Sequence, residues 1–270
     1  MKISIITINY NDKIGLEKTY KSVVNQSCKD FEFVIIDGGS NDGCVQFLEN
    51  NSQNIHYWIS EKDKGVYNAM NKGIKAAEGD YVIFMNSGDA FNNNFVLATM
   101  LPTLNENYGF VYGNSVYYRD NIFERNQTPP KILTFNHFFS DGLNHQAVFI
   151  KRQLFYDSFF YNENYKICSD WEFFIINICL KSVSYKYVET SVVDYDLGGM
   201  SAKAENLIIY KQEREITLRK YFPAFYDGAS FINDMKIKRV QQFYKIRNNK
   251  TAWKIMRGIL NIFMLFFKKD

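Results

Sequence analysis

Short β-branched or aromatic runs alternate with amphipathic segments over the first 85 residues, and this alternation constrains the fold more than any other feature of the chain. Residues 2–8, 31–36, 55–59 and 81–85 form four such runs, each bounded by polar or glycine-containing segments. Runs of this length and composition are typical of buried strands. The sequence therefore predicts four core strands in its first third.

Helical spacing of apolar residues fills the gaps between these predicted strands. Leu16, Tyr20 and Val23 recur at that spacing after a polar start, and residues 66–77 repeat the pattern with Gly79 just past their end. Strands that alternate with helices build parallel βαβ units with right-handed crossovers. We predict an α/β domain with a mostly parallel central sheet flanked by helices.

The later part of the chain has a different pattern. Residues 110–195 are rich in aromatic side chains and show no clear periodicity, whereas the pattern from Glu205 onward is long and helical. These observations predict one domain over residues 1–204, which carries the chemistry, and a helical C-terminal extension over residues 205–270.

Charge separates the body from the extension. Residues 236–269 hold ten Lys or Arg residues and no Asp or Glu, while residues 1–235 hold 22 basic and 28 acidic side chains. One helical face of the extension is apolar and carries Trp253, Met256, Leu260, Phe263, Met264 and Phe267. A basic amphipathic helix is typical of peripheral contact with an anionic membrane, and such a face also suits packing on the catalytic domain or on a second subunit of a homo-oligomer. We expect no nucleic-acid partner, because the rest of the chain gives no support for one.

The N-terminal residues and the cysteines indicate the compartment. Residues 1–11 contain one lysine and a short β-branched run without a small-residue cleavage site, which favours a first strand over a signal peptide. No stretch reaches the roughly 18 uncharged apolar residues of a membrane-spanning helix. The four cysteines show neither metal-ligand spacing nor the density of a disulfide-rich domain. We expect a cytoplasmic protein, peripheral on the inner face of the cell membrane if the extension binds lipid.

Three polar clusters follow predicted strands, at residues 9–11, 37–43 and 86–89. In an open parallel sheet the carboxyl ends of the strands meet at one edge, where ligands bind. Taken alone, the cluster at residues 37–43 is better explained as a polar turn that caps the next helix. The glycine spacing of a dinucleotide fingerprint and the ending of a phosphate-binding loop are both absent from residues 37–43. The shared position of the three clusters predicts a ligand site.

An ordered set of segments extends these clusters. It consists of Thr7-Ile8-Asn9-Tyr10-Asn11, residues 37–43, residues 60–73, Gly79-Asp80-Tyr81, Asn86-Ser87-Gly88-Asp89, and His145-Gln146 followed by Ser169-Asp170-Trp171. As a set, these segments resemble glycosyltransferase family 2, in particular the bacterial members that build capsular, lipopolysaccharide or exopolysaccharide chains. The resemblance covers roughly residues 1–200. It implies a single glycosyltransferase A-type domain.

The resemblance also implies a nucleotide-diphosphate sugar as the donor, with a UDP-sugar favoured. The residues implied to bind it are Thr7, Asn9, Asp37 and Ser40 at the nucleoside, and Asp63, Asn71, Asn86 and His145 at the diphosphate and sugar.

A divalent cation is implied at residues 86–89, which correspond to the family's Asp-x-Asp element. Asn86 and Gly88 stand where most members have aspartates, so Asp89 is the one carboxylate in the motif and the expected metal ligand. A hard ion such as Mg²⁺ or Mn²⁺ suits such a site, because diphosphate oxygens and water fill most of its coordination positions. The alternative is a turn that closes a strand.

The resemblance assigns Asp170 as the base that takes the acceptor proton, with Glu172 as the second candidate. The alternative is that Asp170 only stabilises the helix dipole. Trp171 is suited to stacking on a sugar or to the core. Residues 198–201 are predicted to form a loop that closes over the donor.

The implied function is an inverting hexosyl- or N-acetylhexosaminyltransferase that acts on a hydroxyl of a glycan or lipid-linked acceptor in surface polysaccharide synthesis. Two alternatives stay open. A sugar nucleotidyltransferase would need a basic anion-binding loop near the N-terminus, which residues 9–12 do not offer. A non-catalytic nucleotide-sugar-binding subunit is compatible with a single carboxylate at residues 86–89.

Overall fold

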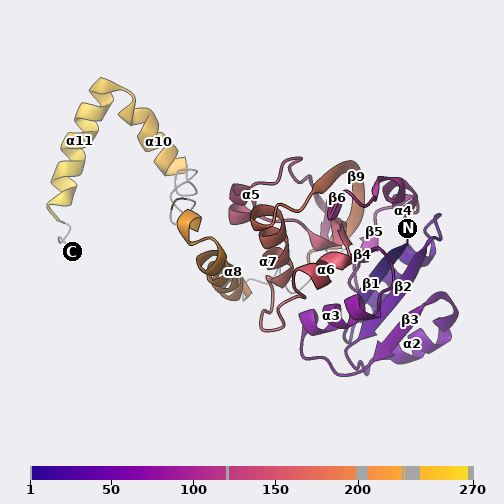
Figure 1. The fold of residues 1–270 in the computed structure, drawn as a ribbon. Helices are drawn as coiled ribbons and strands as arrows, with labels where there is room; N and C mark the ends of the chain where they lie inside the picture. The colour runs from indigo at the N-terminus through magenta and orange to yellow at the C-terminus, as the bar shows by residue number, and fades with distance from the viewer. Residues whose placement is uncertain (1, 120–121, 199–205, 227, 229–237, 267–270) are drawn as a thin grey trace. The chain divides into compact units, whose positions relative to one another are not determined.

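The computed structural model describes all residues except 1, 120–121, 199–205, 227, 229–237 and 267–270 (Figure 1). The chain divides into two units, Met1–Thr217 and Leu218–Asp270. The predicted division after residue 204 falls at a stretch outside the described residues. The observed division lies inside helix α8 (Leu207–Tyr221), so this helix belongs to the first unit as far as Thr217.

Strands and helices alternate in the first part of the first unit, as the sequence predicts. The strands are β1 (Ile3–Asn9), β2 (Phe31–Asp37), β3 (Tyr57–Ser60), β4 (Tyr81–Phe84), β5 (Ala90–Phe91), β6 (Phe110–Arg119), β7 (Ile122–Gln127), β8 (Val148–Lys151) and β9 (Tyr185–Asp196). The helices are α1 (Lys13–Val24), α2 (Cys44–Asn50), α3 (Val66–Ala76), α4 (Val96–Met100), α5 (Phe135–Ser140), α6 (Gln153–Asp157) and α7 (Ser169–Ile175), and α7 continues into a π-helical turn, Ile176–Leu180.

The described strands form one sheet in the order β3-β2-β1-β4-β8-β6-β9-β5, with β7 paired to β6. Strand β1 runs parallel to β2 and β4, and β2 runs parallel to β3. Strand β8 is antiparallel to both of its neighbours, whereas β9 is parallel to β6. The predicted α/β architecture is confirmed, with the parallel pairing concentrated in the half of the sheet that the sequence patterns identify.

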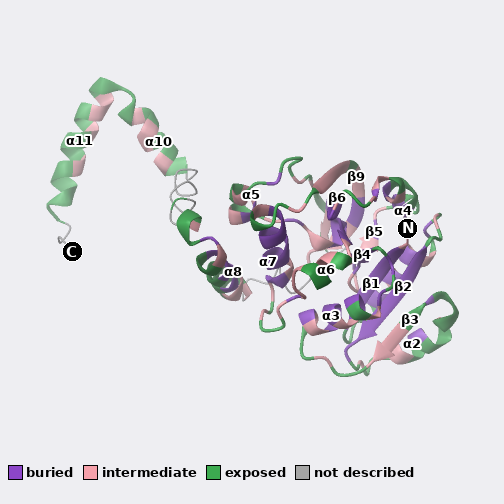
Figure 2. Cartoon of the chain, in the orientation of Figure 1, coloured by how far each residue is buried: buried purple, intermediate pink, exposed green. Residues whose placement is uncertain are grey.

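Both faces of β1, β2 and β4 are buried, which explains why these strands are mostly apolar (Figure 2). Ile3 and Ile5 belong to a hydrophobic cluster that includes Leu16 of α1. On the other face α3 lies directly against β1, because a Cβ atom at Gly73 would stand 2.4 Å from Ile6 Cγ2. Only glycine permits this approach.

Aromatic packing fixes α7 beside α3. The Tyr161 ring lies 5.6 Å from the rings of Tyr67 and Phe84 and 5.7 Å from that of Phe173. Phe173 stacks on Phe155 at 4.4 Å. One cluster of rings therefore connects α3, β4, α6 and α7, and it places the amino end of α7 near the amino end of α3.

The second unit contains α10 (Lys238–Arg247) and α11 (Lys250–Met264). The Phe243 and Trp253 rings meet edge to face at 5.3 Å, and Asn249 caps α11 by accepting a hydrogen bond from Ala252 N at 3.0 Å. Large apolar side chains stay exposed along α11, namely Ile255, Ile259, Ile262, Phe263 and Met264. Phe267 of the predicted apolar face lies outside the described residues. None of the described helices has the length and apolar composition that crossing a membrane requires.

Candidate active site

The carboxyl ends of β1, β2 and β3 bring three polar side chains together. Asn9 is paired with Asp37 and Asp37 with Ser60 in the strand register. Asp37 accepts hydrogen bonds from Asn9 Nδ2 and Ser60 Oγ, both at 2.6 Å, and from the Ser40 hydroxyl, also at 2.6 Å. Burial raises the pKa of Asp37, but these hydrogen bonds outweigh it and leave the pKa below its usual value. The result is an ionised carboxylate at the end of β2.

A cavity of about 1410 Å³ opens beside this cluster. Of the predicted site residues, six line it: Asn9, Asp63, Asn86, Asp89, His145 and Asp170. The β3–α3 loop, the β4–β5 loop, the segment before β8 and the start of α7 form its walls. These segments are far apart in the sequence, so the fold assembles the site.

Four predicted residues, Thr7, Asp37, Ser40 and Asn71, lie behind the wall of this cavity. Thr7 is fully buried and donates a 2.7 Å hydrogen bond to Met85 O. Asn71 donates to Tyr161 O at 2.8 Å and accepts from Tyr161 N at 3.0 Å. Thr7 therefore holds the strand that leads to residues 86–89, and Asn71 holds the segment before α7.

Asp63 lies in the β3–α3 loop and is paired with a lysine. Lys72 Nζ stands 2.7 Å from Asp63 Oδ1 and 2.7 Å from Glu61 Oε1. The Lys72 ammonium thus ties the loop to α3. The loop ends at Gly65, whose φ of +131° is a conformation that favours glycine.

Asp89 closes the β4–β5 loop and is 4% exposed. It accepts hydrogen bonds from Gln146 Nε2 at 2.9 Å and from Asp196 N at 3.2 Å. Desolvation by burial raises the pKa of Asp89 to about 6, against the opposing effect of these hydrogen bonds. Within the described residues, no Lys or Arg forms an ion pair with it. The carboxylate is therefore buried, and no Lys or Arg of the described residues lies within ion-pair distance of it.

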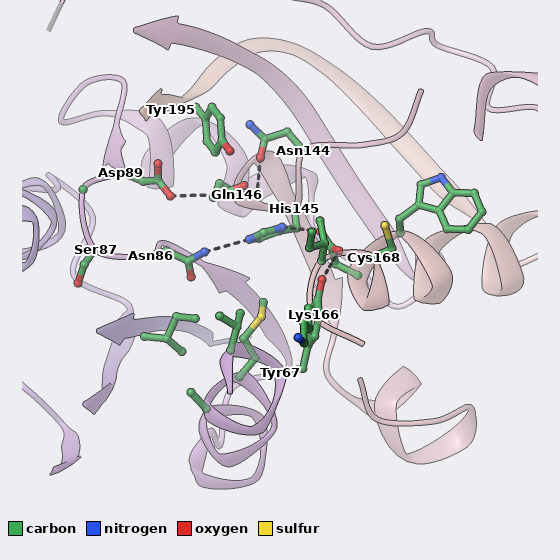
Figure 3. A pocket seen from close by; sticks show the side chains of 18 of the residues that line it. Tyr67, Asn86, Ser87, Asp89, Asn144, His145, Gln146, Lys166, Cys168 and Tyr195 are labelled. Atoms are coloured by element: carbon green, nitrogen blue, oxygen red, sulfur yellow. Dashed lines mark hydrogen bonds and ion pairs between the residues drawn. The ribbon is translucent and has the colours of Figure 1, made fainter. Parts of the chain in front are cut away.

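Asp170 is held by two side chains from other elements. Tyr67 OH donates to its Oδ1 at 2.8 Å, and His145 Nδ1 lies 2.7 Å from its Oδ2. His145 Nε2 in turn lies 3.2 Å from Asn86 Nδ2 (Figure 3). Burial raises the pKa of Asp170, but the hydrogen bonds from His145 and Tyr67 and the charge of His145 outweigh it, so the pKa is lowered. Asp170 is an ionised carboxylate at the cavity wall.

The second candidate base, Glu172, does not line the cavity, whereas the candidate stacking residue, Trp171, lines it but is largely buried. Glu172 is 5% exposed and accepts a hydrogen bond from Thr217 Oγ1 at 3.1 Å. Trp171 is 5% exposed, donates to Phe138 O at 3.0 Å, and has the Arg214 guanidinium 4.3 Å from its ring. Trp171 therefore acts as core. Residues 199–201 of the predicted closing loop lie outside the described residues.

Two residues of the site escape sequence reasoning. Tyr67 lies in a segment of the motif set, but its contact with Asp170 spans 103 residues of sequence. Glu213 on α8 accepts hydrogen bonds from the backbone of Lys166, Ile167 and Cys168 at 2.6, 3.0 and 2.9 Å. In the sequence, Glu213 is an acidic residue within a helical pattern. Such residues usually lie on the solvent-exposed face of a helix, so nothing in the sequence marked Glu213 as part of the site.

Comparison with known proteins adds relatives in bacteria. An uncharacterized glycosyltransferase of Mycobacterium tuberculosis (strain CDC 1551 / Oshkosh) is 43% identical over 103 residues, which is 38% of this chain and 39% of the length of that relative. A PGL/p-HBAD biosynthesis glycosyltransferase of Mycobacterium bovis (strain BCG / Pasteur 1173P2) is 29% identical over 220 residues, which cover 77% of this chain and 81% of that one.

Solved structures share the fold at low sequence identity. S. aureus TarS 1–349, in complex with UDP-GlcNAc, has a TM-score of 0.58 at 18% identity and covers 73% of this chain and 58% of that one. The mannosyltransferase PcManGT of Pyrobaculum calidifontis, in complex with GDP-Man and Mn²⁺, has a TM-score of 0.62 at 12% identity and covers 98% and 81%. Finally, the profile of Glycosyl transferase family 2 matches residues 4–162, more than half of the chain. The chain is an enzyme of this family, a glycosyltransferase.

Proposed function

We propose that this glycosyltransferase moves a hexosyl or N-acetylhexosaminyl unit, with inversion, from a nucleotide-diphosphate sugar to a hydroxyl of a glycan or lipid-linked acceptor. The observation that carries this proposal is the placement of Asp89 and Asp170 on the walls of one cavity, with Asn9 leading to the Asp37 cluster. At about 1410 Å³ the cavity exceeds the roughly 300–1,000 Å³ of small-ligand pockets. It has room for a donor and an acceptor side by side.

The donor nucleoside is proposed to bind at the ends of β1 and β2. Asp37 is ionised and lies behind the cavity wall, so it is proposed to hold Asn9, which lines the cavity, in place for the arriving nucleoside. The glycosyltransferase TarS was solved with a UDP-sugar and PcManGT with a GDP-sugar. We favour a UDP-sugar here.

A divalent cation, Mg²⁺ or Mn²⁺, fits beside Asp89. The Asp89 carboxyl is buried with a raised pKa and without a paired cation, so a bound cation would supply the missing positive charge. Gln146 Nε2 fixes the orientation of this carboxylate. When bound, the ion would neutralise the charge that develops on the departing nucleoside diphosphate.

The acceptor is proposed to bind next to Asp170. Its oxygen forms a bond to the anomeric carbon while the bond from that carbon to the phosphate oxygen breaks, and the electron pair leaves with the nucleoside diphosphate. Direct displacement of this kind inverts the configuration at the anomeric carbon. The hydroxyl proton passes to the base site that contains Asp170.

We further propose synthesis of bacterial surface polysaccharide at the inner face of the cell membrane. The exposed apolar side chains of α11 alternate with Lys254 and Arg257 on a cation-rich second unit. Such a surface suits anionic lipid, where a lipid-linked acceptor resides. The M. bovis relative is named a PGL/p-HBAD biosynthesis glycosyltransferase.

The test is incubation of the full chain with a panel of nucleotide sugars and Mn²⁺. Donor consumption and the anomeric configuration of the product are followed by proton NMR. Transfer with inverted configuration supports the proposal. Donor binding without turnover would indicate a binding subunit, and release of pyrophosphate from a nucleoside triphosphate and a sugar phosphate would indicate a nucleotidyltransferase.

A further inference from the structure

A row of hydrogen bonds crosses the cavity wall from Asn86 through His145 to Asp170. Asn86 Nδ2 lies 3.2 Å from His145 Nε2, and His145 Nδ1 lies 2.7 Å from Asp170 Oδ2 (Figure 3). His145 lines the cavity, with 17% of its side chain exposed. The Oδ1 atom of Asn86 is buried without a partner. The imidazole is therefore held between a carboxylate and an amide.

In a neutral imidazole, these two neighbours favour one tautomer of His145. Asp170 is ionised and only accepts, so the proton of a neutral imidazole sits on Nδ1. The Asn86 amide nitrogen only donates, so it meets the lone pair on Nε2. His145 thus presents an unprotonated Nε2 at the cavity wall.

Asp170 itself is poorly suited to hold a proton. Its two oxygens already receive the Tyr67 hydroxyl and His145 Nδ1, and these hydrogen bonds outweigh burial and lower its pKa. Efficient proton transfer at neutral pH needs a base whose pKa lies near the working pH. His145, by contrast, lines the cavity and has a ring nitrogen, Nε2, that no carboxylate engages.

We propose that His145 Nε2 receives the acceptor proton and that Asp170 orients the imidazole and stabilises the imidazolium that forms. This inference rests on the proposed transferase function and deepens it. The acceptor hydroxyl replaces the Asn86 amide as the donor to Nε2. Its oxygen bonds to the anomeric carbon, its proton moves to Nε2, and the electron pair of the broken bond leaves on the diphosphate. Nδ1–H remains bonded to Asp170 throughout.

The inference explains why a neutral residue at position 86 suits this site. A carboxylate there would face Nε2 while Asp170 faces Nδ1, and two carboxylates would hold the imidazole in its protonated form, which accepts no proton. The other groups near the imidazole are the Tyr67 hydroxyl on the far oxygen of Asp170, the Asp89 carboxyl across the cavity wall, and the Phe84 ring at 6.3 Å. With the neutral Asn86 at this position, Asp170 is the one carboxylate in direct contact with the imidazole of His145.

The first experiment is chemical rescue in the full-length protein. His145→Ala is expected to lower kcat by roughly 10²-fold or more. Added imidazole is expected to raise the kcat of this variant at least tenfold, because the free base can occupy the space that the missing side chain leaves. His56→Gln, an exposed histidine outside the cavity, is the matched control. If Asp170 is the proton acceptor, imidazole leaves His145→Ala unchanged and formate rescues Asp170→Ala; that result overturns the inference.

The second experiment introduces the second carboxylate with Asn86→Asp. The acidic limb of the kcat profile is expected to move upward by on the order of one pH unit or more, because the variant favours the imidazolium. Nitrogen-15 NMR of the three histidines supplies a readout apart from activity: Nδ1–H only in the wild type at pH 8, and both nitrogens protonated in the variant. An unmoved limb and an unchanged His145 spectrum would overturn the inference.

The inference fails separately from the proposed function. If the wild type transfers no sugar from any donor in the panel, the proposed function fails. If the wild type transfers sugar and folded His145→Ala keeps its turnover, only the role of His145 fails. Donor affinity within a few-fold of wild type, together with an unchanged unfolding temperature, shows that each variant is folded and binds.

Discussion

Asn9 Nδ2 donates a 2.6 Å hydrogen bond to Asp37 Oδ1 across the register pair that ends β1 and β2. A carboxylate at this position accepts from several donors at once, including Ser60 Oγ on the next strand. The polar end of the parallel sheet is therefore stabilised by a charge, and its stability must depend on pH.

Asp37→Asn is expected to lower the free energy of unfolding at pH 7 by roughly 1.5–3 kcal/mol, because the new amide would face the Asn9 amide. The native pKa of Asp37 lies below its usual value, so its contribution is present above the unfolded pKa of about 4 and is lost as pH falls through the native value. Urea unfolding at pH 7 and near pH 3 measures this. A variant-to-wild-type difference that stays constant with pH would contradict the assignment.

Asp89→Ala is expected to remove metal-dependent donor binding and to abolish transfer, because no second carboxylate stands in residues 86–89. Calorimetric titration with a UDP-sugar, with and without Mn²⁺, measures the loss. Asp30→Ala, an exposed position before β2, is the control. Unchanged metal-dependent turnover in a folded Asp89→Ala variant would remove Asp89 from the metal site.

Asp170→Asn is expected to lower turnover by roughly 10²-fold or more while the Kd for the donor stays within a few-fold of wild type, since the carboxylate acts on the acceptor proton and not on donor binding. This holds whether the proton ends on His145 or on Asp170. Steady-state kinetics and donor titration check both quantities. A tenfold weaker donor affinity with normal turnover would make Asp170 a donor-binding residue instead.

Glu213→Gln is expected to raise the KM for the acceptor and lower kcat with little change in donor affinity, because three backbone N–H groups before α7 lose their charged acceptor. Glu215→Gln, an exposed position on the same helix, is the control. Kinetics with varied acceptor and varied donor separate the two effects. Equal losses on both substrates would show a general loss of structure.

The second unit is expected to bind anionic vesicles at low salt and neutral vesicles weakly, since each Lys or Arg near an anionic surface contributes on the order of 1 kcal/mol. Charge-reversed Lys254→Glu/Arg257→Glu and apolar-to-acidic Ile259→Glu/Phe263→Glu should each weaken co-sedimentation. A chain ending at Phe231 should lose binding yet keep transfer to a short soluble acceptor. If the truncated protein changes oligomeric state and the intact one ignores anionic vesicles, the helix packs on protein.

The parallel half of the sheet was predictable because its strands are local runs with strong periodicity. Four predicted strands and two predicted helices match β1–β4, α1 and α3 to within about two residues. Strand β8 was not predictable: it is inserted antiparallel between β4 and β6, and its pairing depends on contacts 36 to 70 residues away in the chain.

Site residues were predictable only where a motif carries them. Asp89, His145 and Asp170 each belong to a segment that resembles the family, and the fold brings all three to one cavity. The contacts among the site residues could not be predicted from the sequence. The bond between His145 and Asp170, and that between His145 and Asn86, arise from tertiary packing, and no periodicity reports them.

Helix α8 lies beyond the segment that matches the family, yet its Glu213 ties down the backbone just before Asp170, and its Thr217 holds Glu172. A chimera designed to exchange acceptor preference between relatives should therefore be joined after α8. A chimera joined near residue 204 would combine the segment before α7 from one enzyme with helix α8 from another. If such a chimera were inactive, the cause would be the lost contacts between these two segments and not the chemistry of the donor site.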